Sequence, residues 1–95
     1  MTNDSYCPVC GYDIYSVYHE PAWKGDSQSD NICPCCHIQY GYHDFGKTAQ
    51  EREKRHLELR KKWIEEGMPW RDKIDNEPEN WDPKKQLHNI GIMID

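Results

Sequence analysis

The chain has no long apolar segment. None of its 95 residues lies in a run of about 20 apolar residues, the length that a membrane-spanning helix requires. The first residues, Met1 to Ser5, have neither the basic nor the apolar part of a secretory signal. The sequence therefore predicts no membrane contact and a cytoplasmic protein, in a compartment where thiols stay reduced and disulfides are rare.

Signatures of catalysis are missing as well. No serine lies in a nucleophile-elbow motif, and no glycine-rich phosphate loop is present. Four of the five histidines are scattered along the chain outside the cysteine turns, and each is more typical of a surface or packing residue than of a base: His19, His43, His56 and His88. We therefore expect the protein not to be an enzyme.

Apolar residues are scarce, at 36% of the chain against 31% charged residues, and the mean hydropathy is -1.09. A chain this short and polar supports only a thin core, so we expect a covalent or metal staple. Four tryptophans and six tyrosines add large buried areas from few positions. The net charge of -5 disfavours contact with a phosphate backbone unless the basic residues gather in one place.

Cysteine is the residue that the chain has in excess. Four of its five cysteines form two C-x-x-C turns: the first turn, Cys7-Pro8-Val9-Cys10-Gly11, and the second turn, Cys33-Pro34-Cys35-Cys36-His37, with 22 residues between the inner cysteines. Pairs with this spacing are typical of tetrahedral thiolate metal sites. The sequence predicts a zinc site with the ligands Cys7, Cys10, Cys33 and Cys36.

The second turn leaves the ligand set open. Cys35 could replace Cys36, or His37 could join the set, and the remaining alternatives are unmetallated cysteines or two disulfides. We favour Cys33 and Cys36 because both turns then share one geometry, which leaves Cys35 as a spare thiol. We expect Cys35 to be a small apolar filler, with a reactive group as the alternative. A site with four thiolates has no open coordination position, so we expect it to hold the fold together and not to activate water.

The rest of the pattern predicts a small α+β fold. Aromatic and β-branched residues favour short strands over residues 12–18 and 38–42, which would form β-hairpins around the metal, with a surface loop over 21–31 between them. Because each turn precedes such a segment, the two halves resemble a weak internal duplication. We assign residues 1–46 to a zinc-ribbon-like domain and 47–95 to a helical extension that packs on it as one globular unit.

The extension holds the clearest helix of the chain, over residues 48–66. Thr48 and Glu51 form a capping box, and Gly67 with the following Met-Pro ends the helix. The tryptophans of residues 68–81 predict an ordered wrap around the core. Asp82 and Pro83 have the N-cap and N1 signature of a short second helix that Gly91 ends.

The two turns and their flanks resemble the bacterial cysteine-rich CPCC family. The residues that carry the resemblance are Cys7 to Tyr12 and Ile32 to Cys36, and the similar region spans about residues 5 to 45. The resemblance implies a zinc-ribbon module and supports the metal site. It implies no defined activity.

Residues Cys7 to Tyr12 are also similar to the CPxCGY motif of rubredoxin. That resemblance implies iron in the four-cysteine site and the transfer of one electron. The chain differs from that family in a shorter spacer, in His37 at the position of the second glycine, and in the long helix that follows.

Three functions are therefore compared. We favour a non-enzymatic, zinc-stabilised binding or regulatory module whose partner is a protein, since aromatic side chains and a mixed-charge helix suit protein contacts. The alternatives are an iron electron carrier and a nucleic-acid-binding zinc ribbon. The last is disfavoured because acidic residues interleave with the basic ones at Lys54, Arg55, Arg60, Lys61 and Lys62. Whether the chain forms a homo-oligomer is left open by the sequence.

Overall fold

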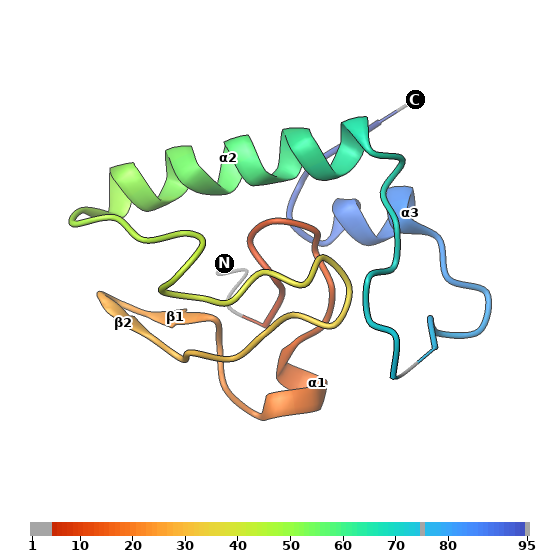
Figure 1. The fold of residues 1–95 in the computed structure, drawn as a ribbon, viewed down its shortest axis with the longest axis horizontal. Coiled ribbons are helices and arrows are strands. Elements are labelled where there is room, and N and C mark those ends of the chain that lie inside the picture. Colours follow the sequence, from red (N-terminus) through yellow and green to blue (C-terminus); the bar gives the residue numbers. More distant parts are fainter. Residues whose placement is uncertain (1–4, 75, 95) are drawn as a thin grey trace.

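A computed structural model describes residues 5–74 and 76–94. It has a small α+β fold with the elements α1 (Tyr15–Tyr18), β1 (Trp23–Lys24), β2 (Ser27–Gln28), α2 (Ala49–Glu65) and α3 (Pro83–His88). The two cysteine turns lie beneath α2, and α3 lies beside them (Figure 1). The predicted fold class is confirmed. The expectations for residues 1–4, 75 and 95 lie outside the described residues.

The long helix α2 forms as predicted. Thr48 is its N-cap and accepts a hydrogen bond from the Glu51 amide at 3.1 Å, while the Glu51 carboxylate accepts from the Lys47 amide at 2.7 Å. At the other end Gly67 adopts a left-handed conformation, with φ of 95°, and its amide bonds to the Ile64 carbonyl. The Thr48 half of the predicted capping box is formed, whereas Glu51 reaches one residue further back than expected. These bonds and the glycine stop fix both ends of α2.

The strand predicted over residues 12–18 is wrong. The segment contains the single-turn helix α1, whose start is stabilised by Asp13, because its carboxylate and carbonyl accept from the Ser16 amide and hydroxyl. His19, with φ of 60°, ends the turn. The local Asp13–Ser16 bonds outweigh the strand preference of the aromatic residues.

The hairpin lies where the sequence predicted a surface loop. Strands β1 and β2 pair antiparallel, with Trp23 opposite Gln28, and Gly25 with φ of 62° makes the tight turn between them. The segment 38–42 contributes only an isolated bridge from Gln39 to Ile32. It bends away because Asp44 accepts the Gly41 amide at 2.6 Å, so the second predicted strand is also wrong.

The segment between α2 and α3 wraps the core through aromatic rings. Trp70 lies edge-on to Tyr12 at 5.4 Å and to Trp81 at 5.6 Å between ring centroids. The indole of Trp63, buried on α2, donates to the Pro69 carbonyl. The tryptophan wrap is thus present over the described part of residues 68–81.

The short helix α3 also begins as predicted. Asp82 caps it by accepting the amides of Lys84 and Lys85, and Pro83 occupies its first turn. Leu87 points into the core and is fully buried. Within the described residues, no helix is long and apolar enough to cross a bilayer.

Candidate metal centre

The first cysteine turn is closed by two backbone hydrogen bonds. The Gly11 amide donates to the Cys7 carbonyl at 2.9 Å, and the Cys7 amide donates to the Tyr12 carbonyl at 2.8 Å. Gly11 completes the bend in a left-handed conformation, with φ of 83°. The turn therefore directs both of its cysteines to one side of the chain.

The second turn repeats this backbone. The His37 amide donates to the Cys33 carbonyl at 2.8 Å, and the Cys33 amide donates to the Ile38 carbonyl at 2.9 Å. His37 is left-handed, with φ of 65°, at the position that Gly11 occupies in the first turn. The two turns are therefore one structure used twice, although the strands expected after them are absent.

Four sulfurs meet between the turns, those of Cys7, Cys10, Cys33 and Cys36, and all lie within 4.8 Å of one another. Across the turns, the Cys7 and Cys36 sulfurs are 3.7 Å apart, and the Cys10 and Cys33 sulfurs are 3.6 Å apart. In a tetrahedron with metal–sulfur bonds of about 2.3 Å, the sulfurs are about 3.8 Å apart. We call these four sulfurs the tetrad. Both distances across the turns match a tetrahedral metal site, and all the other distances stay within 4.8 Å.

Cys35 and His37 lie outside this group of four sulfurs. Cys35 is fully buried, and its sulfur accepts a hydrogen bond from the Gln86 side chain at 3.2 Å. His37 is exposed. The structure therefore brings together the four predicted cysteines and neither of the two alternatives, and it contains all five cysteines as free thiols.

Because the four sulfurs are buried, ionising them without a nearby cation costs free energy. Burial raises the pKa of Cys10, of Cys33 and of Cys36. It also opposes ionisation of Cys7, but hydrogen bonding from the other three cysteines outweighs it, so the pKa of Cys7 lies well below its ordinary value. Without a metal, burial thus opposes ionisation of Cys10, Cys33 and Cys36, whereas a divalent ion would let all four cysteines ionise.

One buried polar atom beside the four sulfurs lacks a hydrogen bond of normal geometry. Tyr40 is fully buried, and within the described residues its hydroxyl interacts with Cys7 without forming a well-aligned hydrogen bond. Burial and then the charge of Cys7 raise the pKa of Tyr40 well above its ordinary value, so the hydroxyl keeps its proton as a donor. A metal-bound thiolate is the acceptor that such a donor would satisfy, and this orphan hydroxyl also fits a metal at the tetrad.

Side chains from both later helices hold the first turn. On α2, the Arg60 guanidinium donates to the carbonyls of Val9 at 3.0 Å and Pro8 at 2.7 Å. From α3 and its C-cap, Gln86 donates to the Cys10 carbonyl at 3.0 Å and Asn89 to the Gly11 carbonyl at 3.1 Å. The helical extension thus contacts the first turn directly.

A second polar cluster lies away from the sulfurs. The buried Asp44 carboxylate accepts from the His56 ring at 2.6 Å and from the Trp23 indole at 2.8 Å. Burial opposes its ionisation, but these bonds and the Gly41 amide outweigh burial and lower the pKa of Asp44. The cluster ties the hairpin and the loop before α2 to the helix.

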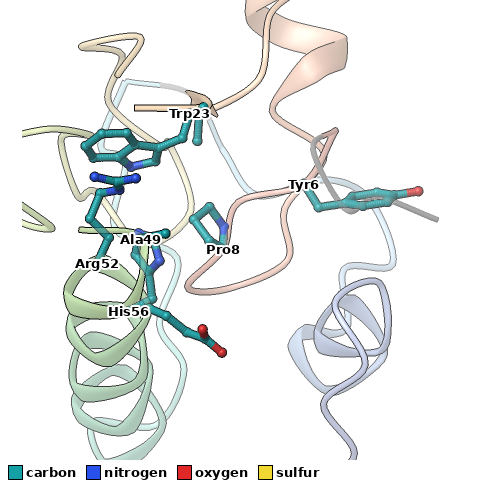
Figure 2. A pocket seen from close by; sticks show the side chains of 9 residues that line it. Tyr6, Pro8, Trp23, Ala49, Arg52 and His56 are labelled. Atoms are coloured by element: carbon teal, nitrogen blue, oxygen red, sulfur yellow. The ribbon is translucent and has the colours of Figure 1, made fainter. Parts of the chain in front are cut away.

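A cavity of about 280 Å³ adjoins this cluster. Figure 2 shows Arg52 against the Trp23 ring on one wall and Pro8 of the first turn beside His56, while the Tyr6 ring points away from α2. Arg52 lies 4.5 Å from the Trp23 ring centroid and pairs with Asp26 at 2.6 Å. The charge of Arg52 is therefore balanced within the molecule by Asp26.

Sequence reasoning missed the residues that surround the tetrad: Tyr40, Arg60, Gln86 and Asn89. Tyr40 had a signal, because it follows Cys36 at the same distance as the buried Ile14 follows Cys10. The other three lie on elements whose packing against the first turn no local pattern reveals.

Comparisons of the chain with models of known protein families, with curated proteins and with solved structures found no match.

Proposed function

We propose that the protein is a zinc-stabilised, non-enzymatic module that acts by binding another protein in the cytoplasm. The observation that carries the metal part is the tetrad, whose four buried sulfurs lie within 4.8 Å of one another, with both pairs across the turns at tetrahedral spacing. Zinc suits four thiolates in this geometry, and cysteines in the cytoplasm stay reduced. The CPCC-like turns of the sequence support the same proposal.

X-ray absorption at the zinc edge tests whether the site is closed. The proposal expects four sulfur neighbours at about 2.3 Å and no nitrogen or oxygen neighbour at about 2.0 Å. Because a closed site offers no position for water, this result supports a structural role. A nitrogen or oxygen ligand in the first shell would contradict it and would reopen a hydrolytic function.

A protein partner is supported by exposed aromatic side chains between the second turn and α2. Tyr42 is 73% exposed and Phe45 is 59% exposed, and aromatic residues are enriched at protein interfaces. The test compares capture of a protein by the wild-type chain and by a Tyr42→Ser, Phe45→Ser double variant. Loss of capture in the variant supports the proposal, whereas binding only to DNA or RNA in a salt-dependent manner contradicts it.

The second candidate is an iron electron carrier, which the same sulfur tetrad favours geometrically. An iron–thiolate protein is red and a zinc protein is colourless. Expression in iron-rich medium therefore separates the two: a colourless protein with one zinc per chain contradicts electron transfer, and a red protein with one iron per chain supports it.

A further inference from the structure

One of the four sulfurs differs from the others in its surroundings. Cys7, Cys10 and Cys33 are 0% exposed, whereas Cys36 is 6% exposed. Cys36 also lines a cavity of about 300 Å³ between the second turn and α2. The cavities on either side of Pro8, by contrast, are not lined by any cysteine.

The Cys36 cavity is lined by groups that attract anions and bind metals. Lys62 from α2 and Arg71 from the following wrap supply two cations, and Glu66 pairs with Arg71. The imidazoles of His37 and His43 also line it. The lining thus has a net positive charge in a chain whose overall charge is -5.

We propose that the Cys36 cavity is a docking site for small anionic chelators, through which the metal enters and leaves the tetrad. The proposal rests on the proposed function, because it needs a metal at the four sulfurs. A donor atom of the chelator uses its lone pair to bond to the metal as the bond to Cys36 breaks. The released thiolate keeps its electron pair and takes a proton from the solvent.

The buried side of the tetrad explains why exchange begins at Cys36. The first turn is covered by Arg60, Gln86 and Asn89, which bind its carbonyls. A donor atom that approached the metal from the side of the first turn would meet these packed side chains, and Cys33 is as fully buried as Cys7 and Cys10. Displacement of Cys36 requires only that a donor atom reaches the metal through an existing cavity.

Stopped-flow transfer of zinc from the loaded full chain tests the charge of the site. The two probes are EDTA, which is anionic, and 1,10-phenanthroline, which is uncharged. Lys62→Gln and Arg71→Gln are each expected to slow transfer to EDTA about three- to tenfold at low salt, with a smaller effect at high salt. Transfer to phenanthroline and the equilibrium zinc affinity are expected to stay unchanged.

Lys61→Gln is the matched charge control, because this exposed lysine is adjacent to Lys62 on α2 and does not line the cavity. An equal slowing by Lys61→Gln would show that only the total charge matters and would overturn the proposal. A transfer rate that is independent of chelator concentration down to the lowest concentrations would overturn it too, because the metal would then leave before any chelator binds.

A steric test does not depend on charge. Leu59 lines the Cys36 cavity, whereas Leu57 is 54% exposed and lines a different cavity. Leu59→Trp is expected to slow transfer to both chelators, and Leu57→Trp is expected to leave both rates unchanged. If Leu59→Trp retains zinc and exchanges at the wild-type rate, the proposal fails while the zinc module stands. If the wild-type chain binds no zinc, both fail.

Discussion

Carbonyls at equivalent positions of the two cysteine turns receive their hydrogen bonds from different kinds of donor. In the first turn, the carbonyls of Pro8 and Val9 accept from one side chain, the guanidinium of Arg60. In the second turn, the equivalent carbonyls of Pro34 and Cys35 accept from two successive backbone amides, at residues 72 and 71. A turn that bends around a metal leaves carbonyls facing outward, and any correctly placed donor can satisfy them. The first turn is therefore the one that a side-chain substitution can weaken.

Glycine is required in one turn and dispensable in the other. A Cβ on Gly11 would lie 2.3 Å from the Gln86 carbonyl oxygen, because α3 packs directly on the first turn. His37 has the same left-handed backbone but is exposed. The close approach of α3, and not the bend alone, thus distinguishes the two positions.

The largest expected effect comes from removing a ligand of either turn. Cys10→Ser and Cys36→Ser are each expected to abolish tight zinc binding and to unfold residues 5–46, because metal binding supplies much of the folding free energy of such modules. Cys35→Ser is the control and is expected to retain one zinc per chain. Elemental analysis and circular dichroism check these outcomes. Loss of zinc in Cys35→Ser alone would show that the ligand register is wrong.

The next largest effect is expected at Gly11, compared with His37, which has the same left-handed backbone conformation. Gly11→Ala is expected to lower the free energy of unfolding by at least about 2 kcal/mol, since the new Cβ overlaps backbone and the conformation itself is strained. His37→Ala is expected to change it by less than about 1 kcal/mol, because the backbone cost is already present. Denaturant unfolding of the metal-loaded chain measures both. Equal losses would disprove the role assigned to α3.

A smaller effect separates side-chain support from backbone support. Arg60→Gln is expected to cost about 1 to 2 kcal/mol, because it removes charged donors to two carbonyls at a half-buried site. Arg71→Gln is expected to cost less than about 0.5 kcal/mol, because the second turn uses the backbone amide and not the side chain. The comparison fails if thermal unfolding shows Arg71→Gln to be the more damaging substitution.

The smallest effect concerns the orphan hydroxyl. Tyr40→Phe keeps the ring and removes the donor, so we expect zinc to be retained with an affinity about tenfold weaker, because the hydroxyl no longer donates to a metal-bound thiolate. In the cobalt-substituted protein, the sulfur-to-metal charge-transfer band is expected to shift. Tyr42→Phe is the control, because Tyr42 is exposed. A spectrum unchanged by Tyr40→Phe would show that the hydroxyl does not bond to a ligand.

The sequence predicted those parts of the molecule that local chemistry determines. The caps at Thr48 and Asp82 and the stop at Gly67 act through neighbouring residues, so α2 and the start of α3 were predicted correctly. The end of α3 was not, because the helix ends at His88 and not at Gly91. The clustering of the four cysteines followed from the repeated turn. Cys35 takes the position of Val9 in the repeat, and both are fully buried, which agrees with its prediction as a filler.

The remaining parts depend on contacts between distant residues. The segment after the first turn has strand-like composition, yet Asp13 and Ser16 bend it into α1. The buried Arg52 was missed because its burial depends on the Trp23 ring and Asp26 of the hairpin, which itself was predicted as a loop. Packing of Arg60, Gln86 and Asn89 onto the first turn likewise spans more than 50 residues of chain.

The most direct test of the account is metal analysis of the purified full chain, before and after chelation, with circular dichroism recorded on the same samples. We expect one zinc per chain before chelation, loss of the folded spectrum once the zinc is removed, and recovery of the spectrum when zinc is returned. A chain that contains no metal yet folds stably, or whose spectrum and thermal unfolding are unchanged by chelation, would contradict the central claim that the four cysteines hold the fold through a metal ion.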